Sequence, residues 1–183
     1  PVVTESKNLL EAVEEAKNKL QTEKIIYRKE EIKGGFLKGN TYKITAISYT
    51  ELISEAKEYL QQVISGLSTE VQFEAKINED TIEIVMYSNH NALLIGQEGK
   101  NLKALETLVI AYLYKKWLSN VKIVLNVENY KEKRILALEK LAIKTAKEVR
   151  ETKIDAELEN MNSFERRVIH NKLANFKGVS TTS

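Results

Sequence analysis

The chain has 183 residues, 43% of them hydrophobic, which is enough for one ordinary domain or for two or three small modules with their own cores. It has no cysteine and two histidines, which excludes disulfides, thiolate metal sites and a histidine-based zinc cluster, so we expect no metal and no cofactor. The net charge is only +2, and neither a signal-peptide pattern nor an apolar run of about 18 residues is present, which favours a soluble, cytoplasmic protein.

Charge is distributed unevenly along the chain. Residues 1–49 carry nine Lys and Arg against seven Asp and Glu, residues 50–130 carry seven against eleven, and residues 131–183 carry twelve against eight. Because phosphate groups are bound where basic side chains cluster, we expect any polyanion to bind the last third of the chain.

Residues 1–49 show the pattern of one helix and a hairpin. Within residues 4–21, apolar side chains from Leu9 to Leu20 recur at the spacings of an amphipathic helix. Residues 25–32 and 42–47 then read as two strands, with three glycines in the turn between them. This segment is therefore predicted to be a small unit with one helix and two strands.

Residues 50–130 contain a longer alternation of helical and strand patterns. The expected order is helix, strand, strand, short helix, glycine loop, helix and strand, at residues 52–64, 71–77, 82–86, 92–95, 96–99, 102–113 and 121–127. A glycine at position 66 is a helix stop, and residues 78–80 supply the turn between the first two strands.

Residues 131–183 begin with a long helix, expected at about 132–151, whose apolar side includes Leu138 and Ala142. At 100° per residue, four lysines form a stripe on the opposite side: Lys133, Lys140, Lys144 and Lys147. Asn162 and Glu165 are expected to cap a last helix that runs to Phe176. Residues 156–158 and 179–182 have the pattern of short strands.

The sequence LIGQEGKNL at residues 94–102 resembles the signature of a KH domain, and the surrounding order of elements resembles the type II KH topology. Two glycines let such a loop approach a sugar-phosphate backbone, and the next helix N-terminus offers N–H groups to anions. Glu98 stands where these loops commonly carry a basic residue, and it should repel a phosphate. The RNA contacts expected here are Gly96, Gln97, Glu98, Gly99, Lys100 and Lys103.

The sequence MNSFERRVIH at residues 161–170 resembles the R-three-H motif in the form typical of the Jag family. Positions i and i+4 share one helix face, so Arg166 can present its guanidinium group to a phosphate beside His170. A serine replaces the proline that this family usually has at position 163. The RNA contacts expected in this segment form one basic face: Lys133, Lys140, Lys144, Lys147, Arg166, Arg167 and His170.

The whole chain is similar to the Jag family, because KGGFLKGN at residues 33–40 also resembles the loop of its N-terminal domain. The resemblance implies an α+β chain of three modules: a Jag N-terminal domain at 1–49, a type II KH domain at 50–130 and an R-three-H domain at 131–183. Residues 178–183 resemble the start of the last R-three-H strand, which fits a chain truncated at that point.

The resemblance implies a non-catalytic protein that binds single-stranded RNA, with single-stranded DNA as an alternative ligand. It implies a post-transcriptional regulator linked to cell elongation, envelope assembly or sporulation, with a small single-KH protein or a second copy as partner. The first rival hypothesis is an interaction scaffold in which the acidic KH unit mainly dimerises. A hydrolase is disfavoured, because the sequence has few histidines and no clustered carboxylate motif.

Overall fold

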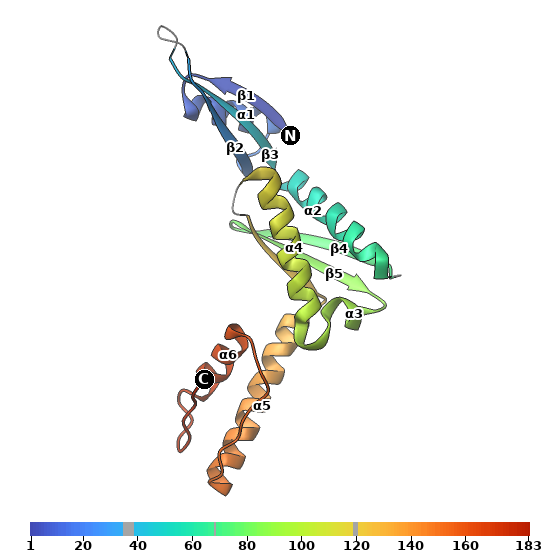
Figure 1. Ribbon diagram of the computed structural model, residues 1–183, viewed down its shortest axis with the longest axis vertical. Helices are drawn as coiled ribbons and strands as arrows, with labels where there is room; N and C mark the ends of the chain where they lie inside the picture. The colour runs from blue at the N-terminus through green and yellow to red at the C-terminus, as the bar shows by residue number, and fades with distance from the viewer. Residues whose placement is uncertain (35–38, 68, 119–120) are drawn as a thin grey trace. The chain divides into compact units, whose positions relative to one another are not determined.

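The computed structural model describes residues 1–34, 39–67, 69–118 and 121–183. Its helices and sheets make an α+β protein, as predicted, and the chain divides into two compact units, Pro1–Glu128 and Asn129–Ser183 (Figure 1). A further division at residues 49 and 50 stays a prediction. Among the described helices, none is long and apolar enough to cross a membrane.

The first sheet has the antiparallel order β1-β3-β2, formed by β1 (Val2–Ser6), β2 (Ile25–Ile32) and β3 (Thr41–Ser48). Helix α1 (Leu9–Leu20) packs Ala12 and Ala16 against Ile44 and Ala46 of β3. The prediction of a helix from residue 4 was wrong, because β1 pairs with β3 and the Asn8 side chain caps α1. The loop predicted at residues 33–40 lies partly outside the described residues.

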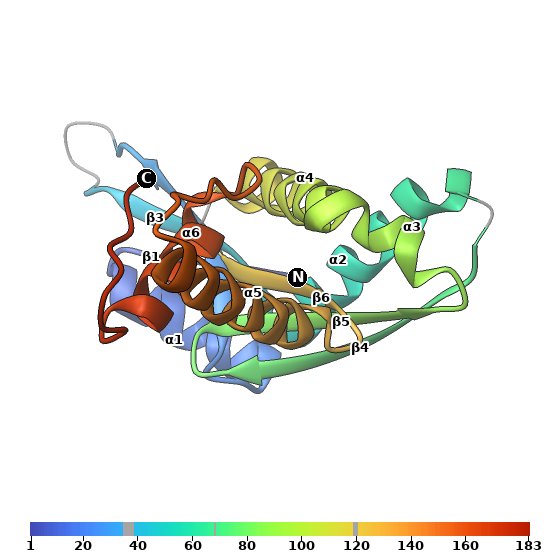
Figure 2. The ribbon, with the colours of Figure 1, turned by 90° about the horizontal axis from the view of Figure 1, so that it is seen from below.

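The second sheet belongs to the segment with the KH-type signature, and its order of elements is the predicted one. The elements are α2 (Tyr49–Ile64), η1 (Ser65–Leu67), β4 (Val71–Asn78), β5 (Thr81–Ser88), α3 (Asn91–Ile95), η2 (Gln97–Gly99), α4 (Lys100–Trp117) and β6 (Lys122–Val127). Strand β5 pairs antiparallel with β4 and parallel with β6, so α3 and α4 form the crossover that a parallel pair requires. Helices α2 and α4 cover the same side of this sheet (Figures 1 and 2).

Aromatic side chains join α2 to α4. The rings of Tyr59 and Tyr112 stack with 4.3 Å between their centroids, and the indole N–H of buried Trp117 donates to Glu55 at 3.0 Å. Lys116 pairs with the same carboxylate at 2.9 Å, and this hydrogen bond raises the pKa of the lysine. These contacts fix the two helices side by side above β4, β5 and β6.

The unit Asn129–Ser183 consists of two packed helices and two extended segments. Helix α5 (Tyr130–Thr152) and helix α6 (Ser163–Leu173) enclose Leu138, Ala142 and Ile169. The strands predicted at 156–158 and 179–182 are absent from this unit, all of which the structure describes, because neither segment pairs with another strand. Helix α6 also ends at Leu173 rather than at Phe176.

Glu165 anchors α6 to α5. Its backbone N–H donates to the Asn162 side chain at 3.0 Å, and its carboxylate accepts from the Asn162 N–H at 3.3 Å, which is the predicted capping box. The other carboxylate oxygen accepts from Arg134 Nε of α5 at 2.8 Å. Glu165 is 5% exposed, so its charge is held almost without water. One side chain therefore both begins α6 and fixes its position on α5.

Replacing Glu165 with alanine should lower the free energy of unfolding by about 1 to 3 kcal/mol, because it removes the buried acceptor of Arg134 Nε and of the Asn162 N–H. The matched change Glu159→Ala, at an exposed carboxylate of the same unit, should cost less than about 0.5 kcal/mol. Urea unfolding followed by circular dichroism measures both. Equal losses for the two variants would contradict the anchoring role of Glu165.

Candidate nucleic-acid interface

The glycine loop between α3 and α4 has an unusual backbone. Gly96 has φ 70° and ψ 177°, and Gly99 has φ 79° and ψ 14°. Between them, Glu98 adopts a left-handed conformation with φ 54° and ψ 27°. Glycine takes positive φ values without the Cβ clash that penalises other residues, so the two glycines form a tight turn directly before α4.

Asn101 holds this loop from inside α4. Its side-chain N–H donates to the Leu93 carbonyl at 2.8 Å, which ties the first turn of α4 to α3. A Cβ at position 96 would lie 2.6 Å from Asn101 Cγ, so Gly96 is required by contact as well as by conformation. Sequence reasoning missed Asn101; the only signal was an amide residue in the first turn after the second glycine.

Carboxylates balance the predicted cations of this loop. Lys100 Nζ lies 3.9 Å from Glu98, and Lys103 Nζ lies 2.7 Å from Glu106. Glu106 is 8% exposed and also accepts from the Leu125 N–H at 3.0 Å, so it belongs to the core of the unit. The structure thus places the six predicted loop residues at one end of α4. Each of the two lysines among them lies beside one carboxylate. No side chain caps α4 at Gly99, so its first N–H groups point toward this end.

Arg166 and His170 face the same groove, as their spacing predicts. The groove has a volume of about 1040 Å³ and runs between α5, residues 155–161, α6 and residues 179–183. The Arg166 guanidinium group donates to the Ser183 hydroxyl at 3.4 Å, and His170 Nδ1 lies 2.6 Å from the Thr181 hydroxyl oxygen. Both side chains therefore point toward the last residues of the chain. Arg167, which is exposed, does not line this groove.

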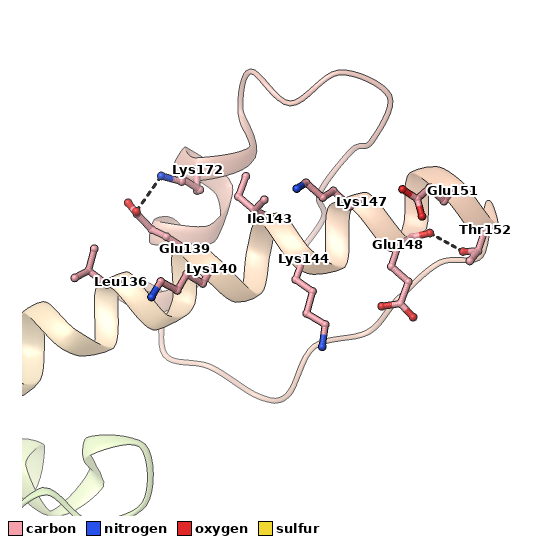
Figure 3. A pocket seen from close by; sticks show the side chains of 10 residues that line it. All are labelled: Leu136, Glu139, Lys140, Ile143, Lys144, Lys147, Glu148, Glu151, Thr152 and Lys172. Carbon is pink, nitrogen blue, oxygen red and sulfur yellow. Dashed lines mark hydrogen bonds and ion pairs between the residues drawn. The ribbon is translucent and has the colours of Figure 1, made fainter.

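The lysine stripe lies on another surface. Lys140, Lys144 and Lys147 line a groove of about 700 Å³ along α5, together with the apolar residues Leu136 and Ile143 (Figure 3). This groove shares no residue with the groove of Arg166 and His170, whose α5 wall includes Ala142 and Ala146. At 100° per residue these alanines point about half a turn away from the lysines.

The expectation of one continuous basic face in this unit is therefore corrected. Helix α6 covers the apolar side of α5, so Arg166 and His170 lie across α5 from its lysine stripe, and of the α6 residues it is Lys172 that lines the lysine groove. Lys133 is exposed two turns before Lys140 and is not part of either groove. The structure brings three of the four lysines together, and it separates them from Arg166 and His170.

Carboxylates also lie in the lysine groove. Lys172 from α6 pairs with Glu139 at 2.9 Å, and Glu148 and Glu151 line the far end of the groove (Figure 3). The four lysines of the groove thus share it with three acids, and the wall between them is largely aliphatic. Such a surface attracts a phosphate backbone more weakly than its lysine count indicates.

Among the residues that the structure describes, no group of three or more His, Asp or Glu side chains could hold a metal ion. The predicted site residues offer charge, hydrogen-bond donors and backbone groups. Arg166 supplies a planar donor fork, His170 a ring with two nitrogens, and the glycine loop a closely approachable backbone.

Comparison with known proteins divides the chain at a similar place. A family model described as KH domain matches residues 55–135, and one described as R-three-H domain matches residues 136–183. A protein named RNA-binding protein KhpB from Clostridium symbiosum is 34% identical over 189 residues, which cover 100% of this chain and 85% of that protein.

Two further relatives carry the same name. The Bacillus subtilis protein is 35% identical over 124 residues, which cover 68% of this chain and 60% of that protein. The Lactiplantibacillus plantarum protein is 34% identical over 126 residues, which cover 69% of this chain and 39% of that protein. The chain therefore spans less than two thirds of the length of these two relatives.

Gly96→Ala should destabilise the protein by at least about 1 kcal/mol, because the new methyl group meets Asn101 and the residue keeps a positive φ. Gly66→Ala is the matched control, since a Cβ at position 66 has no neighbour within 4 Å. Thermal unfolding of both variants measures the difference. A Gly96→Ala variant as stable as the wild type would show that the loop tolerates a side chain there.

Proposed function

The chain belongs to the Jag family of KH and R-three-H domain proteins, and on that premise we propose that it binds single-stranded RNA without catalysing a reaction on it. It is then a cytoplasmic post-transcriptional regulator, linked to cell elongation, envelope assembly or sporulation. Relatives that are 34–35% identical to this chain are named RNA-binding protein KhpB in three bacteria, which supports this proposal.

The exposed charge of α6 is the observation that carries the proposal. The helix exposes Arg166 and Arg167, and its single acidic residue, Glu165, is buried and paired with Arg134. Asp155, Glu157 and Glu159 line the groove of Arg166, but Arg167 lies outside that groove. No exposed acid therefore lies on α6 itself. Guanidinium groups form paired hydrogen bonds with phosphate oxygens, which makes this helix a suitable contact for an RNA backbone.

The glycine loop adds a second contact of a different kind. Loops of this type clamp about four nucleotides through their backbone, and this loop has the glycine conformations that allow close approach. Its paired lysines contribute less charge than α6. In this proposal the R-three-H unit therefore supplies most of the electrostatic attraction, and the KH loop supplies shape.

A protein scaffold remains the second candidate function, and two observations favour it. The KH loop carries Glu98 where RNA would approach, and α4 exposes apolar side chains at Leu108 (44%), Tyr114 (51%) and the following Leu118 (61%). Exposed apolar side chains on one helix are common at protein interfaces. The partner would be a second copy of the chain or a small single-KH protein.

Arg166→Ala should weaken RNA binding about 10- to 100-fold, the equivalent of a charge-assisted hydrogen bond worth about 1.5 to 3 kcal/mol, while stability changes by less than about 0.5 kcal/mol. The slope of log affinity against log salt should fall by about 0.7, as for one lost phosphate contact. Fluorescence anisotropy with a single-stranded RNA at several salt concentrations measures both quantities.

Lys177→Ala is the control for this experiment, because Lys177 is an exposed cation of the same unit that lines neither groove. Its affinity should stay within about twofold of wild type. Phosphate recognition by α6 would be contradicted by an RNA affinity that does not change with salt concentration. It would also be contradicted by an Arg166→Ala variant that binds RNA as tightly as the control.

Glu98→Gln tests whether the KH loop touches RNA. Removal of the carboxylate beside Lys100 should tighten RNA binding by up to about fivefold, the effect of an exposed charge contact. The control Glu58→Gln, at an exposed carboxylate of α2, should leave the RNA affinity unchanged. Unchanged affinity for Glu98→Gln, together with a concentration-dependent dimer in sedimentation, would favour the scaffold over the RNA clamp.

A further inference from the structure

Phe164 is an aromatic side chain that the fold does not use. It is the second residue of α6 and is 59% exposed, while the core of its unit is built from Leu138, Ala142 and Ile169 with their partly buried neighbours. In residues 129–183, all of which the structure describes, it is the only exposed aromatic residue. A ring this exposed stabilises the fold less than a buried one would, and it stays accessible to a ligand.

The arrangement of residues around α6 places Phe164 beside the exposed cation Arg167. Glu165, Ile169 and Leu173 form the side that packs on α5, so Arg167 points away from α5 at 100° per residue. Phe164 lies on one flank of Arg167. Arg166 and His170 lie on the other flank.

Phe164 and Arg167 are three residues apart on α6. Residues three apart on a helix have Cβ atoms about 5 to 6 Å apart, so the ring of Phe164 and the guanidinium group of Arg167 are neighbours on one surface. An exposed ring with an adjacent cation is the combination that holds a nucleobase and its phosphate together.

Charge distinguishes this surface from the lysine groove on α5. The groove has an aliphatic wall and contains Glu139, Glu148 and Glu151, whereas α6 exposes no carboxylate. Asp155, Glu157 and Glu159 line the groove of Arg166, but Phe164 and Arg167 do not line that groove. A polyanion with flat, unpaired rings therefore fits the α6 surface, because a base can stack on Phe164 while its phosphate meets Arg167.

We propose that Phe164 is a base-stacking residue, on which one unpaired nucleobase stacks while Arg167 contacts the phosphate beside it. The inference rests on the proposed function, because it names how the same site recognises RNA. It adds selection for single-stranded RNA, since bases in a duplex have their faces covered by their neighbours. It also implies little preference among bases, because each of them has a flat aromatic face.

The test compares binding of the full chain to two RNAs of the same composition, a single strand of about ten nucleotides and a blunt-ended duplex. Phe164→Ala should weaken single-strand binding about fivefold or more and leave duplex binding unchanged, since a stacked base contributes about 1 to 3 kcal/mol. Phe164→Trp should restore the affinity, because indole offers a larger stacking face. Anisotropy titrations give the affinities, and thermal melts confirm that each variant folds.

Ile154→Ala is the matched control, because Ile154 is 70% exposed, lies in the same unit and lines neither groove. It should bind both RNAs as wild type does. If Phe164→Ala melts early, Phe164→Leu replaces it, with the same loss expected because leucine has no ring. A single strand bound equally by wild type and by these variants overturns the stacking role and leaves the proposed function standing. A wild-type chain that binds no RNA overturns both.

Discussion

The position of one buried carboxylate, Glu165, determines which side chains the C-terminal unit exposes. Helix α6 has 11 residues, a length at which an isolated helix is marginal in water. Glu165 stabilises it by closing the capping box with Asn162, and the same carboxylate binds Arg134 of α5. Because Glu165, Ile169 and Leu173 then face α5, the remaining sides of α6 point outward. The outward residues include Phe164, Arg166, Arg167 and His170.

This packing also divides the basic residues into two sets with different surroundings. Lysines on α5 share a groove with three acids, and the arginines of α6 lie on a helix whose only acid is buried. Charge counts along the chain cannot distinguish the lysines of α5 from the arginines of α6, because the sum for residues 131–183 includes both sets. Coulomb attraction depends on the nearest counter-charge. Arg166 shares its groove with Asp155, Glu157 and Glu159, whereas Arg167 is exposed outside both grooves.

The KH-type loop differs from α6: it keeps the tight glycine turn, but its lysines are paired with carboxylates. Gly96, Gly99 and Asn101 maintain the tight turn before α4. Lys100 and Lys103 each lie beside a carboxylate, and the neighbouring α4 exposes apolar side chains. The two domains therefore differ in what they offer a ligand: the first a backbone and an apolar surface, the second cations and an aromatic ring.

Local pattern alone determined the helices and strands of residues 49–127 and the capping box at Asn162, since periodicity and capping act over a few residues. It missed β1, whose partner β3 is about 40 residues away, and it predicted two strands in the C-terminal unit that have no strand beside them there. The motif spacing correctly put Arg166 and His170 on one side of α6. Only the tertiary structure decided that the lysines lie across α5 from them, that acids neutralise the loop lysines, and that Phe164 stays exposed. Each of these depends on which side of a helix another element covers, and that is set by long-range packing.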